Sequence, residues 1–149
     1  MARPAPGSQA AAIVKRLADY DQRAAILADF DEAIRFDDAR DGSAWSTANI
    51  RFNDFFREIV LRFQFEDALL LDTRGNVVYT AYKGVDLGTN ILTGPYRESG
   101  LRDAYEKAIA SNAVDYVGVT DFGNYQPADE PTAWMLSPIG PRGRVEGVL

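Results

Sequence analysis

The sequence of 149 residues contains no cysteine and no histidine. Without cysteine, disulfide bonds, thiolate metal sites and cysteine nucleophiles are excluded. Without histidine, the chain lacks the commonest general base and the commonest metal ligand of proteins. We therefore expect no catalytic residue, no metal site and no cofactor, and an enzyme is the least favoured class of protein.

The sequence also lacks a long apolar run and an excess of basic residues. No window approaches the roughly 18 consecutive apolar residues of a membrane-spanning helix. Residues 1–8 are small and proline-rich, without the apolar core of a signal peptide, and we expect them to be disordered. The net charge of -6 argues against nucleic acid and against anionic membrane surfaces as partners.

Acidic and glycine-rich stretches do not form known ion-binding or phosphate-binding motifs. The carboxylates of segments 37–41 and 129–130 lack the spacing of a calcium loop, so we interpret both segments as solvated loops. Gly84, Gly88 and Gly94 do not match a nucleotide-binding loop, because Lys83 precedes these glycines instead of ending the loop.

Hydrophobic periodicity predicts three helices. The first runs from about Gln9 to Ala39 and needs a packing partner along its length. The second is capped by Ser46 or Thr47 and ends near Phe63, and its phenylalanines are expected in the core. The third starts near Glu98 or Ser99 and ends near Asn112.

Five short strands are predicted around the third helix, at about 68–71, 77–82, 116–120, 132–136 and from Val145 onward. The first two form a hairpin, because Gly75 and Asn76 tolerate the left-handed backbone of a tight turn. This order favours the α+β class, with a five-stranded antiparallel sheet, a long N-terminal helix and covering helices. The strand in progress at Leu149 indicates a piece of a longer protein.

The hairpin leads into a polar, glycine-rich loop, and the segment from Asp67 to Tyr105 contains the run GTNILTGPYRESGL. Together with DFGNYQP further along, this segment resembles the first half of a Cache domain, a PAS-like extracytoplasmic sensor of bacterial chemoreceptors, histidine kinases and nucleotide cyclases. The resemblance covers residues 65–149 and is closest to the membrane-distal module of double Cache domains. It implies leading helices over residues 9–64, an extracytoplasmic location and attachment to the membrane through segments outside this chain.

Aromatic and polar side chains gather in the loop and near the ends of the later strands. An aromatic body with a polar tip suits a half-wet cavity for a small polar ligand. A carboxylate at its mouth would suit an amine, and an arginine a ligand carboxylate. We therefore expect the ligand-binding residues to be Tyr82, Asn90, Thr93, Tyr96, Arg97, Asp121, Tyr125 and Trp134.

The sequence thus favours a ligand-binding sensor module without catalysis. The alternative is a structural or dimerisation module with a vestigial pocket, which would form a homodimer through its long helix. An intracellular PAS domain with a bound cofactor is a weaker interpretation, because the usual histidine and cysteine attachment points for haem or flavin are missing.

Overall fold

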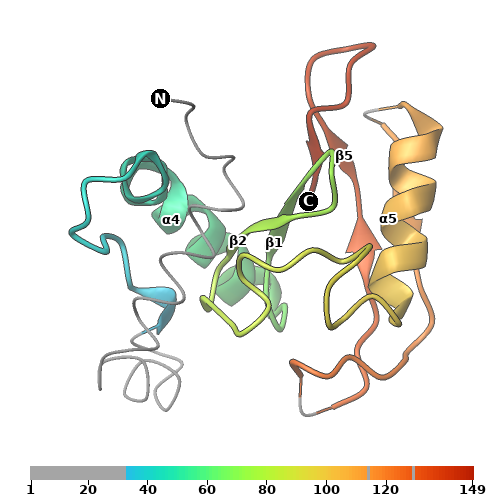
Figure 1. Ribbon diagram of the computed structural model, residues 1–149, viewed down its shortest axis with the longest axis horizontal. Coiled ribbons are helices and arrows are strands. Elements are labelled where there is room, and N and C mark those ends of the chain that lie inside the picture. Colours follow the sequence, from blue (N-terminus) through green and yellow to red (C-terminus); the bar gives the residue numbers. More distant parts are fainter. Residues whose placement is uncertain (1–32, 114, 129) are drawn as a thin grey trace. The chain divides into compact units, whose positions relative to one another are not determined.

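The computed structural model describes residues 33–113, 115–128 and 130–149 (Figure 1). The described part contains helices α4 (Ala44–Phe63) and α5 (Gly100–Ser111). Its strands are β1 (Leu69–Asp72), β2 (Val77–Thr80), β3 (Gly118–Val119), β4 (Met135–Leu136), β5 (Pro138–Ile139) and β6 (Gly147–Val148). The α+β class with antiparallel pairing is therefore confirmed.

Contacts along the chain divide it into two compact units. Of the described residues, unit 1 contains 33–69 and 78–88, and unit 2 contains 70–77, 89–113, 115–128 and 130–149. Neither α4 nor α5 is long and apolar enough to cross a membrane.

The strands form two sheets instead of the expected single five-stranded sheet. One sheet has the order β2-β1-β6-β5 and the other pairs β3 with β4. The strand expected at 132–136 is reduced to Met135–Leu136, and a strand that was not expected, β5, follows Ser137 and pairs with a different neighbour. Met135 pairs with Val119, whereas Pro138 pairs with Val148.

The last strand is confirmed. Gly147 and Val148 pair with both β1 and β5, and Leu149 exchanges two backbone hydrogen bonds with Ser137 at 2.8 and 2.9 Å.

Helix α4 begins before the expected cap. The side chain of Ser43 accepts a hydrogen bond from the Ser46 amide at 3.0 Å, so the helix starts at Ala44, and it ends at Phe63 as predicted. The side chains that it buries are Ser46, Asn49, Asn53 and Val60. The expectation of core phenylalanines is wrong for Phe55 and Phe63, which are 60% and 62% exposed.

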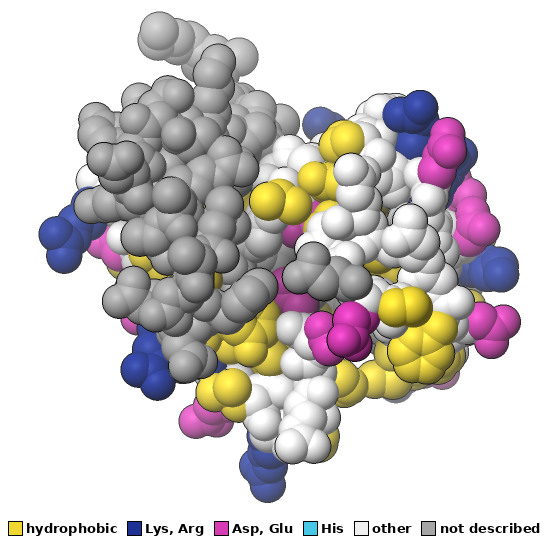
Figure 2. Space-filling view, turned by 90° about the horizontal axis from the view of Figure 1, so that it is seen from below, with side chains coloured by type: hydrophobic (Ala, Val, Ile, Leu, Met, Phe, Trp, Pro, Cys, Tyr) yellow, Lys and Arg dark blue, Asp and Glu magenta, His cyan; other side chains and the backbone are white. Residues whose placement is uncertain are grey.

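Helix α5 matches its predicted bounds and contacts β3, β4 and β6 within unit 2. Asn112 ends it in the left-handed conformation, and Leu101, Ala104, Tyr105 and Ala108 form its buried face. The Tyr105 hydroxyl donates to the Asp72 carbonyl at 2.9 Å, which ties the helix to the end of β1. Basic and acidic side chains lie together on the side of the molecule where α5 is found (Figure 2).

The turn between β1 and β2 forms as predicted, but its two key residues act differently. Gly75 adopts a φ of 80°, and its amide donates to the Asp72 carbonyl at 3.0 Å. Asn76 is not left-handed; its backbone and side-chain amides both donate to the Asp72 carboxylate, at 2.9 and 2.8 Å. The carboxylate therefore holds the turn closed.

The long helix expected from Gln9 to Ala39 lies mostly outside the described residues, as do residues 1–8. At its C-terminal end only Ala33 and Ile34 are helical, and residues 36–39 are not.

Gly75→Ala should destabilise the protein by about 1 to 3 kcal/mol more than Gly143→Ala. Both glycines have φ near 80°, so both alanines carry similar backbone strain. A Cβ at Gly75 would lie 2.8 Å from Cγ of Leu92, whereas nothing lies within 4 Å of a Cβ at Gly143. Urea unfolding of the two variants measures the difference, and equal losses would contradict the crowding at Gly75.

Candidate functional site

Three of the expected ligand-binding residues form an aromatic cluster in unit 2. The rings of Tyr96 and Tyr125 lie 5.9 Å apart, and those of Tyr125 and Trp134 lie 4.8 Å apart, edge to face at 86°. Tyr125 is buried, whereas Tyr96 and Trp134 are half-buried. The cluster joins the loop after β2, the loop after β3 and the residue before β4.

Backbone pairing fixes Trp134 in place. Its carbonyl accepts from the Thr120 amide at 2.9 Å, and its own amide donates to the Thr120 hydroxyl at 2.9 Å. Within the described part of the chain, no acceptor is paired with the indole N–H of Trp134.

Asp121 follows the β3–β4 ladder. The register changes after Thr120, because Gly118 pairs with Leu136 whereas Gly123 pairs with Thr132, so the alternation of side chains along β3 does not extend to Asp121. Trp134 shares a face of the ladder with the buried Leu136. The Asp121 carboxylate is exposed, and it makes no hydrogen bond or ion pair with any described residue. No hydrogen bond, ion pair or ring contact among the described residues joins Asp121 to the aromatic cluster.

Asn90 and Thr93 organise the loop itself. The Asn90 side-chain oxygen accepts from the Leu92 and Thr93 amides at 2.9 and 3.0 Å, and its nitrogen donates to the Arg74 carbonyl at 2.8 Å. The Thr93 hydroxyl also donates to Asn90, at 3.2 Å. These bonds give both residues a local structural role that sequence reasoning did not assign to them.

The described contacts of Arg97 and Tyr82 are with other residues than those of the cluster. Arg97 is exposed; it donates to the Gly94 carbonyl at 3.2 Å and lies 3.8 Å from the Glu98 carboxylate. Tyr82 belongs to unit 1, where its backbone amide donates to the Asp67 carboxylate at 3.3 Å.

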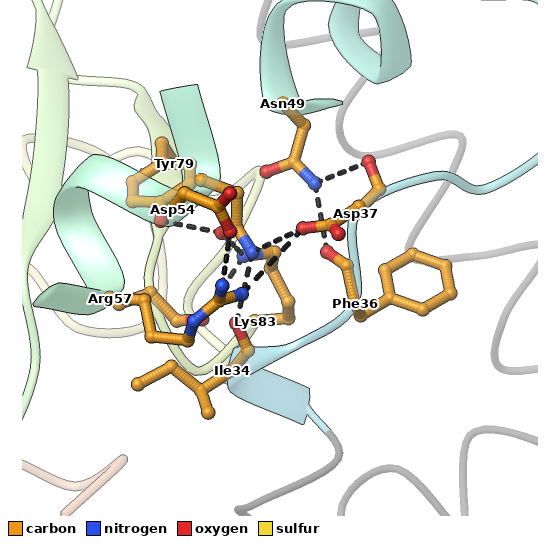
Figure 3. Close-up of polar contacts among 10 residues, drawn as sticks. Ile34, Phe36, Asp37, Asn49, Asp54, Arg57, Tyr79 and Lys83 are labelled. Atoms are coloured by element: carbon orange, nitrogen blue, oxygen red, sulfur yellow. Dashed lines mark hydrogen bonds and ion pairs between the residues drawn. The ribbon is translucent and has the colours of Figure 1, made fainter. Parts of the chain in front are cut away.

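Unit 1 contains a buried polar cluster around Asn53 and Lys83 that the sequence reasoning missed (Figure 3). Asn53 has no exposed surface and makes four side-chain hydrogen bonds. Its oxygen accepts from the Tyr79 hydroxyl at 2.8 Å and from the Lys83 ammonium at 2.6 Å. Its nitrogen donates to the Ile34 carbonyl at 2.9 Å and to the Asp37 carboxylate at 2.8 Å.

Lys83 follows β2 in a left-handed conformation, with φ at 55°, and is 7% exposed. Besides Asn53, its ammonium donates to the Ala81 carbonyl at 3.0 Å, and its Nζ lies 4.5 Å from the centre of the Tyr79 ring. Burial lowers the pKa of Lys83 from 10.5 to about 7, against the attraction of Asp67 and Asp37.

Charged groups surround the cluster on its α4 side. Arg57 lies 4.0 Å from the Asp37 carboxylate and also pairs with Asp54 (Figure 3). Asn49 donates to the carbonyls of Phe36 and Asp37 at 2.9 and 2.8 Å. Its oxygen is buried and has no hydrogen-bond partner, which leaves one unsatisfied acceptor beside the cluster.

Asp67 closes the open end of the hairpin in unit 1. Its carboxylate accepts from the Ala68 and Ala81 amides at 2.7 and 2.8 Å. Burial raises the pKa of this carboxyl from 3.8 to about 7, and the charge of Asp86 adds to the increase, while the backbone donors oppose it.

A sequence signal for this cluster exists in α4. Ser46, Asn49 and Asn53 recur at helical spacing, as an apolar stripe would. The side-chain amides of Asn49 and Asn53 in this stripe are the signal that the buried face of the helix donates hydrogen bonds to backbone carbonyls. The apolar residues of the same helix were the stronger signal, and from them the face with Phe55 and Phe63 was wrongly predicted to be buried.

The described residues offer no group of three or more acidic side chains that could hold a metal ion. Comparisons of the chain with protein-family models, curated proteins and solved structures found no match.

The free energy of unfolding should pass through a minimum near neutral pH. Asp67 holds its proton more tightly in the folded state, so stability falls as pH rises from about 4 to 7. Lys83 holds its proton less tightly in the folded state, so stability rises again from pH 7 toward 10.5. Urea unfolding between pH 5 and 9.5 measures both slopes.

Lys83→Met should abolish the rise in the free energy of unfolding above pH 7 and leave the fall in this free energy below pH 7. The exposed Lys107→Met is the matched control and should keep both slopes. An unchanged rise in Lys83→Met would show that Lys83 is not its source.

Asn53→Leu should destabilise the protein by at least about 3 kcal/mol, because it leaves a buried hydroxyl and a buried ammonium without their shared acceptor. Asn49→Leu, on the same face of α4, should cost less, because the Asn49 oxygen accepts nothing. Chemical unfolding of both variants compares them. A larger loss in Asn49→Leu would refute the central role of Asn53.

Proposed function

We propose that this chain is an extracytoplasmic, ligand-binding sensor module of a bacterial transmembrane signalling receptor, without catalysis of its own. The ligand is a small polar molecule, an amine or a carboxylate. The proposal combines the resemblance of residues 65–149 to Cache domains with the geometry of unit 2.

The arrangement of the strands supports a PAS-like sheet. Only Ser137 separates β4 from β5, so the segment from Met135 to Ile139 pairs with β3 at one end and with β6 at the other. Taken as one bent strand, this segment gives the order β2-β1-β6-β5/β4-β3. A five-stranded antiparallel arrangement follows from that interpretation.

The observation that carries the proposal is the aromatic cluster of Tyr96, Tyr125 and Trp134. Three rings from distant segments meet at the end of the β3–β4 ladder, and only the middle ring is fully buried. The Trp134 indole N–H is an open donor beside these rings. Half-exposed rings with a directed polar group are typical of sites that enclose a small ligand.

Lys83, the most perturbed basic group, does not favour an enzyme. A nucleophilic lysine needs a free amine that faces a substrate. The Lys83 ammonium instead donates to Asn53 and Ala81 and packs on the Tyr79 ring. Its geometry supports a structural role.

A thermal-shift screen of amines, amino acids, carboxylates and nucleobases tests the proposal. A bound compound at a hundred times its Kd should stabilise the protein by roughly 2.7 kcal/mol. Tyr96→Ala should weaken the binding of that compound by at least about tenfold, or roughly 1.4 kcal/mol. The variant should lose little stability, because Tyr96 is half-buried.

Asp121→Ala separates the two ligand classes. A tenfold loss of affinity would indicate that the ligand is an amine that pairs with the Asp121 carboxylate. Unchanged affinity would indicate that the aromatic cluster binds the ligand without Asp121. Lys107→Ala, at an exposed position of α5 in the same unit, is the control and should leave affinity unchanged. If a compound stabilises the protein and its affinity is unchanged by substitution of Tyr96, Tyr125 or Trp134, the aromatic cluster is not its binding site.

A further inference from the structure

The exposed side of α4 carries an aromatic stripe. Ala48, Phe52, Phe55, Ile59 and Phe63 follow one another at intervals of three and four residues, which places them on one side of the helix. Phe52, Phe55 and Phe63 are 47%, 60% and 62% exposed. We call these five residues the phenylalanine stripe.

The stripe lies to one side of the buried face of the same helix, about 110° around the helix axis. Asn49, Asn53 and Val60 point into unit 1, where the two amides hold the segment before α4. The helix is therefore anchored through its polar face. Its apolar side has no such role among the described contacts, and exposed aromatic stripes of this kind mark interaction surfaces.

Charged residues border the stripe in a self-complementary pattern. Arg51 and Glu58 lie along one edge, seven residues apart, and the Arg51 guanidinium lies 5.0 Å from the centre of the Phe52 ring. With Phe52 and Ile59 at the a positions of a heptad, Ala48 and Phe55 occupy d positions, and Arg51 and Glu58 occupy g positions. Charges at g positions select the partner and its orientation.

We propose that the phenylalanine stripe binds the same stripe of a second copy of this chain, as an antiparallel helix pair. Phe52 packs against Phe55 of the partner subunit, and Ala48 against Ile59 of the partner subunit. This alignment sets Arg51 opposite Glu58 of the partner subunit. The two-fold axis repeats every contact, so two ion pairs flank one aromatic core.

The surface involved predicts a weak dimer. With roughly 200 Å² for each phenylalanine, the exposed fractions of the stripe and of Phe65 amount to about 400 Å² of aromatic surface per copy. That is below the area of a standard stable interface. We therefore expect a dissociation constant between about 10 µM and 1 mM.

Sedimentation equilibrium of the full chain, from about 5 µM to 1 mM, tests the proposal. The native chain should change from monomer to dimer across this range. Arg51→Glu and Glu58→Arg should each weaken the dimer by at least about tenfold, because each places like charges opposite one another. An equimolar mixture of the two variants should form a heterodimer, because mixing restores both ion pairs.

Lys107→Glu, a charge reversal of the same size on α5 in unit 2, is the control and should leave the dimer unchanged. Phe55→Ser should give a monomer with native circular dichroism. A native chain that stays monomeric at 1 mM would overturn the proposal, and so would variants that fail to rescue one another. A Phe55→Ser variant that melts earlier without a change in mass would show that the chain covers the stripe itself.

Discussion

The four hydrogen bonds of Asn53 are the constraint on which unit 1 depends. A buried amide is costly unless its donors and acceptor are all paired, and here every bond goes to a different partner. Those partners lie before α4, on β2 and after β2. Removal of this one side chain would take a hydrogen bond away from groups in three segments, so Asn53 determines how they fit together. The buried Lys83 ammonium restricts the arrangement of these segments further, because an ammonium in an apolar interior requires acceptors at fixed positions.

This constraint explains why α4 buries Asn49 and Asn53 while Phe52, Phe55 and Phe63 stay exposed. The helix buries the face that carries Asn49 and Asn53, because their side chains bond to groups inside unit 1. Most of its apolar side chains therefore lie on other faces. Val60 is the exception, a fully buried apolar residue near the C-terminal end of the same face. Helices in globular proteins usually bury their apolar side, so the reversal gives α4 an unusual surface for a helix in a small chain.

Local signals in the sequence predicted the parts of the fold that depend on neighbouring residues. The turn at Gly75, both ends of α5 and the end of α4 at Phe63 follow from backbone preferences and periodicity within a few residues. The pairing of Gly147 and Val148 was also predictable, because an apolar run follows the Gly143 turn. The division into two sheets was not, since it depends on which distant strand each half of segment 135–139 meets.

The candidate site was predicted in part for the same reason. Tyr96, Tyr125 and Trp134 meet as expected, but Asp121 makes no described contact with them. The position of a residue just after a short strand depends on register, which no local pattern fixes. The polar roles of Asn90 and Thr93 are local and were recognisable as turn chemistry. Lys83 was passed over because its partner Asn53 is 30 residues away, in a helix whose pattern favoured an apolar buried face.

The two tryptophans of the chain give each unit its own optical reporter. Trp45 lies in unit 1, where its indole N–H donates to the Val78 carbonyl at 2.8 Å, and Trp134 lies in unit 2. Fluorescence from a chain with Trp45 alone follows the loss of the Asn53 arrangement, and fluorescence from a chain with Trp134 alone follows the aromatic cluster. Extrinsic hydrophobic dyes would bind the exposed phenylalanines of the native state, so intrinsic emission is the cleaner signal. Coincident or separate transitions of the two tryptophans would then tell whether this chain melts as one cooperative body or as two.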